Sequence, residues 1–234
     1  MSKYIALIGA GNWGKNYLRN LYDMGVLHCV LDKSKDIIKA RPRVYPDINC
    51  VDDEDDILKN REIKAVVIAA PAHLHYGMTK KCLLAGKHIL VEKPLALEYG
   101  DGKELVDIAE RKKRILMVGY ILHNHYAVRR LREIIDSGEI GDIRYIYSNR
   151  LNLGILRANE NVLWSFAPHD ISLILILMDN QEPLYVNAFG ESYITGGVYD
   201  TTVTELGFRK RLKSHIFLSW LHPYKGTEIC NHRQ

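Results

Sequence analysis

The sequence predicts an α/β domain built on a parallel sheet, followed by a partial α+β domain built on a mainly antiparallel, open sheet. The first prediction rests on short apolar runs that alternate with helical patterns as far as residue 118, an order typical of a parallel sheet with helices on both faces. The second rests on strand-like stretches that dominate after Gly119-Tyr120 and are joined by turns. We therefore place the two domains at residues 1–120 and 121–234.

Continuous apolar runs mark the strands of the first domain, as expected for strands buried on both faces. We predict strands at 4–8, 28–31, 65–69, 88–91 and 115–118, and helices at 12–24, 74–85 and 98–113. Gly25 and Gly86 follow two of these helices, in the position where glycine commonly ends a helix. Ligands of such open sheets bind beyond the carboxyl ends of the strands, so the functional residues of this domain are expected there.

The second domain is expected to combine two helices with a set of strands. Apolar residues at helical spacing predict an amphipathic helix over 128–135 that stops at Ser137-Gly138. Its arginines, Arg129, Arg130 and Arg132, are most simply a solvated face. A very apolar helix is predicted at about 168–178, and strands at 143–150, 184–189, 201–208 and 212–220. The strand pattern fades after Tyr224, and residues 230–234 do not resemble a strand.

The composition is that of an ordinary globular protein, with 234 residues, 47% hydrophobic and 26% charged. The 32 basic and 28 acidic residues are mixed along the chain, which argues against nucleic-acid binding. The longest apolar run, 171–178, is too short to span a bilayer and no signal-peptide core precedes the first strand, so we expect a cytoplasmic protein without a membrane partner. Cys29, Cys50 and Cys82 lie in contexts typical of reduced, buried thiols.

The segment from Gly9 to Gly14 matches the pattern G-x-G-x-x-G between a predicted strand and a predicted helix, which is the context that dinucleotide binding requires. The first glycine permits a tight turn, Gly11 lets the backbone approach a diphosphate, and Gly14 lets the helix pack closely on the strand. The start of the helix offers unpaired N–H groups and partial positive charge to the phosphates. We expect cofactor contacts from Gly9, Gly11, Asn12, Trp13 and Gly14.

Asp32 ends the second predicted strand, eighteen residues after Gly14. A carboxylate at this place accepts hydrogen bonds from an adenosine ribose and repels a 2′-phosphate, so the predicted cofactor is NAD rather than NADP. Lys33 and Lys35 lie close by and weaken that preference. The alternative is an ordinary turn beside a solvated aspartate.

The tripeptide Glu92-Lys93-Pro94 directly follows the strand predicted at 88–91. A lysine after a strand is by itself usually solvated. Here it lies at the edge of the sheet where the dinucleotide is expected, which favours a role in chemistry.

With these motifs the sequence resembles the Gfo/Idh/MocA oxidoreductases, named for glucose–fructose oxidoreductase and inositol dehydrogenase. The resemblance covers nearly the whole chain and rests on segments 9–14, 70–75, 85–95, 118–120 and 167–172. It implies an N-terminal Rossmann domain, an open-faced C-terminal α+β domain, and hydride exchange between a nicotinamide and a hydroxyl of a sugar or polyol. Segments 148–154 and 161–164 look most similar to members associated with nucleotide-sugar and surface-polysaccharide synthesis.

The resemblance also implies roles for single residues of the first domain. Lys93 would contact the nicotinamide ribose and polarise the reacting hydroxyl, while Glu92 and Pro94 fix its position. The bond before Pro94 is expected to be cis. Ala70, Pro71 and His75 would line the nicotinamide side.

In the second domain, the resemblance places His169 opposite the nicotinamide as the proton acceptor. Pro168 and Asp170 suit the first turn of the apolar helix, so a partly buried histidine at a helix start is the alternative. Ser165 occupies the position where the family often has an aspartate, and serine cannot act as the same base. Further expected substrate contacts are Tyr120, Arg150, Asn152 and Arg157. For Arg150 and Arg157, an ordinary surface arginine is an equally good explanation.

Two further expectations concern the assembly and the end of the chain. Family members generally continue beyond the point where this sequence stops, which predicts a shortened second domain with an unpaired sheet edge. The resemblance also implies a homo-oligomer, since family dimers and tetramers often pair through the C-terminal sheet. The rival functions are a truncated nucleotide-binding module without turnover and a reductase for a non-sugar carbonyl or imine. The pairs His73/His75 and His123/His125 lack the company of a zinc site, so no metal is expected.

Overall fold

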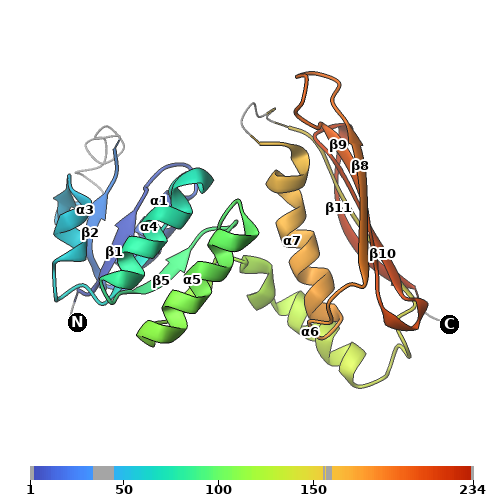
Figure 1. Ribbon diagram of the computed structural model, residues 1–234, viewed down its shortest axis with the longest axis horizontal. Helices are drawn as coiled ribbons and strands as arrows, with labels where there is room; N and C mark the ends of the chain where they lie inside the picture. The colour runs from blue at the N-terminus through green and yellow to red at the C-terminus, as the bar shows by residue number, and fades with distance from the viewer. Residues whose placement is uncertain (1–2, 34–44, 155, 157–159, 233–234) are drawn as a thin grey trace. The chain divides into compact units, whose positions relative to one another are not determined.

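A computed structural model describes residues 3–33, 45–154, 156 and 160–232, and divides the chain into two compact units, Met1–Gly119 and Tyr120–Gln234 (Figure 1). Each unit has its own sheet and its own buried core. They are described separately below.

The first unit contains a six-stranded sheet in the order β3-β2-β1-β4-β5-β6, in which every pairing is parallel. Its strands are β1 (Ile5–Ile8), β2 (Leu27–Leu31), β3 (Cys50–Val51), β4 (Ala65–Ile68), β5 (His88–Val91) and β6 (Leu116–Val118). Its helices are α1 (Gly14–Asp23), α3 (Glu54–Leu58), α4 (Ala72–Leu84) and α5 (Tyr99–Lys112). The predicted parallel α/β sheet is thereby confirmed.

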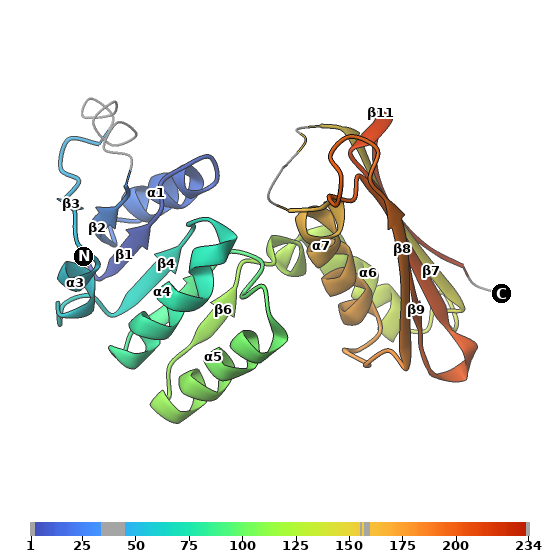
Figure 2. The same ribbon diagram turned by 45° about the horizontal axis from the view of Figure 1, so that its top comes forward.

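Alternate residues of the central strands build separate cores on the two faces of this sheet. Leu7 and Val67 pack with Leu18 and Leu21 of α1 on one face. The neighbouring residues of the same strands pack on the other face with α3, α4 and α5. Helices on both faces bury the central strands β1 and β4 almost completely, and Figure 2 shows them around the sheet.

Two cysteines of this unit are buried, as the sequence predicted, and one is not. Burial raises the pKa of Cys29 to about 11, so this thiol stays protonated at neutral pH. Cys50 is exposed, which corrects the prediction, because it lies on the short edge strand β3.

The second unit contains a five-stranded sheet in the order β11-β7-β10-β9-β8. Its strands are β7 (Tyr145–Leu153), β8 (Tyr185–Glu191), β9 (Thr201–Gly207), β10 (Lys213–Ser219) and β11 (Leu221–His232). Only β7 and β10 pair in parallel, so the sheet is mainly antiparallel, as predicted. The short helix η1 (Ile121–Asn124) precedes α6 (Tyr126–Asp136), and α7 (Val162–Leu177) packs on one face of the sheet, with Ala167 and Ile174 against Ile216 and Leu218.

The helix predicted at about 168–178 begins earlier, at Val162, with Asn161 as its cap. The side-chain oxygen of Asn161 accepts a hydrogen bond from the N–H of Trp164 at 3.0 Å. Pro168 therefore lies inside the helix rather than in its first turn, and Asp170 is in the middle of the helix.

The end of the chain also differs from the prediction. Residues from Leu221 to His232 form β11, which pairs with β7, although no strand was expected at residues 230–232. Polar residues dominate β11, and its Ile229 packs against the core. Backbone pairing with β7 forms this strand in spite of its weak apolar pattern.

A buried carboxylate, Asp200, ties the end of β10 to the connection between β8 and β9. It accepts hydrogen bonds from the indole Nε1 of Trp220 at 2.5 Å and from the N–H groups of Tyr193 and Ile194 at 2.6 and 2.8 Å. Burial alone would raise the pKa of Asp200, but these hydrogen bonds hold it below its ordinary value.

We therefore expect Asp200→Asn to destabilise the protein by about 2 kcal/mol at neutral pH, because a charged acceptor of three hydrogen bonds is lost. A lowered pKa in the folded state contributes stability above the pKa of the unfolded chain, about 3.9, which disappears as the pH falls below it. Urea unfolding at a series of pH values should show the gap between wild type and variant shrinking below about pH 4. The exposed Glu182→Gln serves as the control, and a gap independent of pH would contradict this role.

Candidate functional site

The turn between β1 and α1 is shaped by two glycines that leave no room for a side chain. Gly9 has a φ of +89°, and a Cβ there would lie 2.6 Å from the carbonyl oxygen of Ala69. A Cβ on Gly14 would lie 2.0 Å from the carbonyl oxygen of Gly9. A Cβ on Gly11 would meet no protein atom within 4 Å, so this glycine leaves open space next to the backbone. The tight turn and the open approach are the features that a bound diphosphate requires.

The first turn of α1 offers donors to an anion. The N-cap of the helix, Trp13, makes no side-chain hydrogen bond to it, and no acidic residue lies in the first turn. Nearby, the carboxylate of Asp32 accepts a hydrogen bond from the N–H of Ala10 at 2.5 Å. Asp32 thus lies beside the glycine-rich turn, at the carboxyl end of β2. These residues suit a dinucleotide with a free ribose at its adenosine end.

Glu92 connects this turn to the tripeptide after β5. One of its carboxylate oxygens accepts hydrogen bonds from the indole Nε1 of Trp13 and the hydroxyl of Tyr17, both at 2.6 Å. The other oxygen accepts from the N–H of Lys93 at 3.3 Å. Burial and the Glu92 carboxylate raise the pKa of Tyr17 above its ordinary value, so Tyr17 remains a donor. A Cβ on Gly119, at the end of β6, would lie 2.8 Å from Glu92 Oε1, so the carboxylate is enclosed on that side too.

Glu92→Ala should lower the free energy of unfolding by about 2 kcal/mol, because Trp13 and Tyr17 lose their shared acceptor. Glu92→Gln should lose less, since its amide oxygen still accepts hydrogen bonds. Urea unfolding measures both, with the exposed Glu110→Ala as control. A loss for Glu92→Ala no larger than for this control would refute the connection.

His75 supports the loops that follow β4 and β5. Its ring nitrogens lie 2.6 Å from the carbonyl oxygen of Pro94 and 2.8 Å from that of Ala70, and the residue is only 1% exposed. The peptide bond between Lys93 and Pro94 is cis, as the family resemblance implied. Because its ring is buried between these loops, His75 joins them, and the expectation that it lines the nicotinamide side stays a prediction. Pro71 is the N-cap residue of α4, at the edge where β4 ends.

In the second unit Arg150 is engaged by another residue of the protein. Its guanidinium donates from Nε and Nη2 to the carboxylate of Asp170, at 2.8 and 3.1 Å. Ser148 donates to the same carboxylate at 2.6 Å, and the Asp170 side chain is 2% exposed. Asp170 therefore joins α7 to β7 instead of complementing a helix start. Breaking a buried pair of this kind is costly, which gives Arg150 a structural function.

The other predicted residues of the second unit come from α7, from β7 and from the segment before η1. His169 and Ser165 are both on α7, four residues apart and thus on the same side of the helix, since α7 begins at Val162. Asn152 is on β7, and Tyr120 stacks on the ring of His123, with ring centroids 5.3 Å apart. Arg157 lies outside the described residues.

Sequence reasoning missed Tyr17 as a partner of Glu92. Tyr17 lies four residues after Trp13 on the same face of α1, and that spacing was a usable signal.

Among the described residues no group of three or more His, Cys, Asp or Glu side chains could hold a metal ion. The helices in that part of the chain are also too short or too polar to cross a membrane.

Family models match both units. Residues 3–120 match the oxidoreductase family with an NAD-binding Rossmann fold, and residues 128–231 match the GFO/IDH/MocA C-terminal domain.

Individual relatives show the same similarity. A dTDP-3,4-didehydro-2,6-dideoxy-alpha-D-glucose 3-reductase of Streptomyces violaceoruber is 38% identical over 40% of this chain and 28% of its own length. A UDP-N-acetylglucosamine 3-dehydrogenase of Acidithiobacillus ferrooxidans is 27% identical over 81% of this chain and 58% of its own length. The chain thus corresponds to only part of the length of each relative.

Solved structures share the fold. The structure of GenD2 from gentamicin A biosynthesis in complex with NAD superposes with a TM-score of 0.87, at 19% identity, covering 99% of this chain and 73% of the other.

Proposed function

Since the chain belongs to the Gfo/Idh/MocA family of oxidoreductases, we propose that it exchanges a hydride between NAD and a hydroxyl or keto group of a sugar, polyol or nucleotide sugar. The observation that carries this proposal is the contact through Glu92, which joins the glycine-rich turn to the backbone of Lys93. Through this contact one carboxylate fixes both the diphosphate site and the lysine that acts on the substrate.

Cofactor binding uses the carboxyl edge of the first sheet. The diphosphate would lie against Gly11, Asn12 and the start of α1, with Trp13 beside it, and Asp32 would accept hydrogen bonds from the adenosine ribose. Bound there, NAD supplies the acceptor for a hydride. The loops at Ala70-Pro71 and Glu92-Lys93 would flank the nicotinamide.

Two side chains of this protein would handle the proton of the substrate. The ammonium group of Lys93 would donate a hydrogen bond to the reacting hydroxyl and stabilise the oxygen as its proton leaves. His169 would accept that proton while the C–H bond transfers its electron pair as hydride to the nicotinamide, leaving a keto group. Ser165, on the same side of α7, would only orient the histidine, because a hydroxyl is a poor base at neutral pH.

Substrate identity is argued from relatives and from the second unit. Two relatives carry names that specify dTDP and UDP sugars, and this supports a nucleotide sugar here. Tyr120 and Asn152 are the proposed polar contacts. Arg150 is a weaker contact than the sequence suggested, because Asp170 already occupies its guanidinium fork.

We also propose that the protein is a cytoplasmic homo-oligomer formed through the second sheet. Side chains alternate across strands, so Tyr147 and His215, whose rings stack at 5.9 Å, lie on the face opposite to α7. On the edge strand β8, Phe189 is 71% exposed. Sedimentation should therefore find two or more chains per particle, and a monomer at all concentrations would refute this proposal.

A substrate screen tests the proposed function. The protein is incubated with NAD and a set of sugars, polyols and nucleotide sugars, and the appearance of NADH is followed. We expect substrate-dependent NADH formation with at least one nucleotide sugar. NADH binding without turnover of any sugar would instead favour a nucleotide-binding module, and oxidation of NADH by a non-sugar ketone or imine alone would favour the other reductase.

A further inference from the structure

A concave surface in the second unit lies among the ends of α6, α7 and the turn between β9 and β10. The hollow has a volume of about 860 Å³ and contains none of the residues assigned above to the cofactor or the substrate. Five cationic side chains line it: Arg132, Arg144, Arg209, Lys210 and Arg211. Its acidic lining residues are Asp142 and Asp179. The pocket is thus strongly positive.

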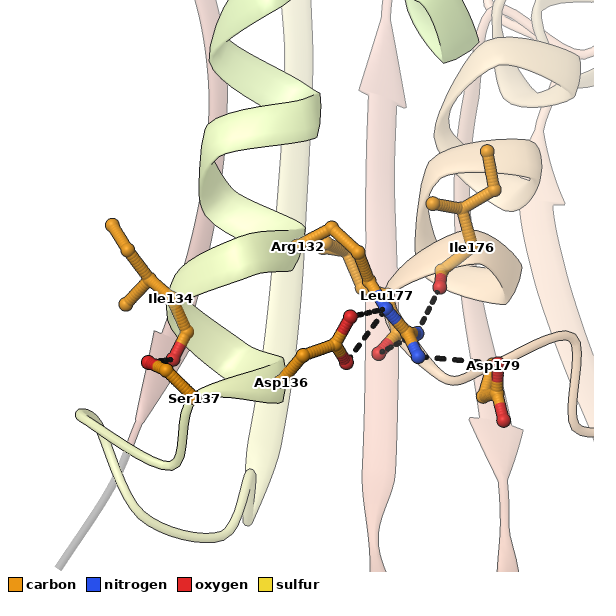
Figure 3. Close-up of polar contacts among 7 residues, drawn as sticks. All are labelled: Arg132, Ile134, Asp136, Ser137, Ile176, Leu177 and Asp179. Carbon is orange, nitrogen blue, oxygen red and sulfur yellow. Dashed lines mark hydrogen bonds and ion pairs between the residues drawn. The ribbon is translucent and has the colours of Figure 1, made fainter.

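Arg132 builds one wall of this pocket and is held in place on three sides (Figure 3). From α6 its guanidinium donates to the carbonyl oxygen of Ile176 at 2.7 Å, near the end of α7, and to the carboxylate of Asp179 at 3.1 Å. It also pairs with Asp136 one turn further along α6 at 2.9 Å. This corrects the view of Arg132 as part of a solvated face, and it neutralises Asp179.

The other four cations have no such partners. Among the residues that the structure describes, no carboxylate pairs with Arg144, Arg209, Lys210 or Arg211, and all four side chains are exposed. Asp142 is the remaining carboxylate of the pocket and leaves a clear excess of positive charge. Like charges gathered around one hollow repel each other, so an anion placed there would relieve this repulsion.

The turn that carries three of these cations has an unusual backbone. Lys210 and Arg211 have φ values of 56° and 60°, in the left-handed region, which residues other than Gly, Asn and Asp rarely adopt. The turn is closed by hydrogen bonds between the backbones of Phe208 and Leu212, at 2.9 Å, and of Leu212 and Arg209, at 3.3 Å. Turn stability alone would therefore favour glycine or asparagine at positions 210 and 211. Both positions instead carry cations that line the pocket.

We propose that this pocket binds a small ligand bearing two or more linked phosphates. Guanidinium groups match phosphate oxygens with two parallel hydrogen bonds, and the volume is that of a typical small-molecule site. The cations are grouped around one hollow of about 860 Å³ rather than along a stripe, which favours a small molecule over a nucleic-acid duplex. The proposal is independent of the redox function argued above.

Calorimetric titration of the full chain with pyrophosphate tests this proposal. The triple variant Arg209→Gln/Lys210→Gln/Arg211→Gln should bind at least about tenfold more weakly than wild type, and Arg144→Gln several-fold more weakly. The matched control, Arg111→Gln/Lys112→Gln/Lys113→Gln at the end of α5, removes the same charge from the first unit and should change the affinity less than about twofold. Circular dichroism verifies that each variant is folded.

Binding of pyrophosphate at the glycine-rich turn of the first unit would be equally present in all these variants, so only the difference between them counts. Equal affinity in wild type, the triple variant and Arg144→Gln would overturn the proposal, as would an equal loss in the control. Tighter binding of a DNA duplex than of pyrophosphate, abolished by the triple variant, would also overturn it in favour of a nucleic-acid surface.

Discussion

Lys93→Met is expected to lower kcat by about 10²–10⁴ while changing the Kd for NAD by less than about twofold. Methionine has nearly the length of lysine but cannot donate a hydrogen bond to the reacting hydroxyl, so the proton-transfer step loses its assistance. The backbone N–H at this position donates to the carboxylate of Glu92, and this contact does not depend on the ammonium group. The diphosphate of the dinucleotide is proposed to bind at the glycine-rich turn between β1 and α1, so the affinity for NAD should be unchanged.

The measurement is steady-state turnover with the substrate found in the screen, together with a calorimetric titration with NAD. Lys112→Met removes an exposed lysine at the end of α5 and should retain full activity. Near-normal turnover of Lys93→Met would contradict the proposed role of Lys93.

Gly14→Ala should destabilise the first unit by about 3 kcal/mol or more, because the added Cβ would lie 2.0 Å from a backbone oxygen of Gly9 that cannot move away. Gly11→Ala should leave the stability of the fold unchanged and weaken the binding of NAD instead. Its Cβ would meet no protein atom within 4 Å, so the folded state is kept, but the methyl group would occupy the space where the diphosphate approaches. We expect the Kd for NAD to rise by about tenfold or more for Gly11→Ala, a loss of about 1.4 kcal/mol.

Thermal unfolding and calorimetry separate these two effects. Gly100→Ala, in the first turn of α5, is a matched control with equally open space and should alter neither quantity. A strongly destabilised Gly11→Ala, or one that binds NAD as wild type does, would contradict the assignment of the turn.

The parallel sheet could be predicted because continuous apolar runs such as 65–69 have few alternatives to a strand buried on both faces. The two-residue strand β3 and the short helix α3 leave too little periodicity to be recognised. The start of α7 differs from the prediction because a proline is typical of a first turn, whereas Pro168 lies seven residues after the cap at Asn161. The strand β11 depends on pairing with β7, which a polar segment does not reveal by itself.

For the site, local motifs were informative and long-range contacts were not. The glycine-rich turn follows from a short segment, and the cis bond before Pro94 from the family resemblance. The shared acceptor of Trp13 and Tyr17 lies more than 70 residues away in the sequence, at Glu92, and the partner of Arg150 lies on another element. Such pairs are set by the packing of strands and helices and cannot be read from spacing.

The most direct test of the account is calorimetric titration of the folded wild-type chain with NADH and, separately, with NADPH. The account predicts one NADH site per chain and weaker binding of NADPH, whose 2′-phosphate would be repelled by the carboxylate of Asp32. A well-folded protein that takes up neither dinucleotide would contradict it.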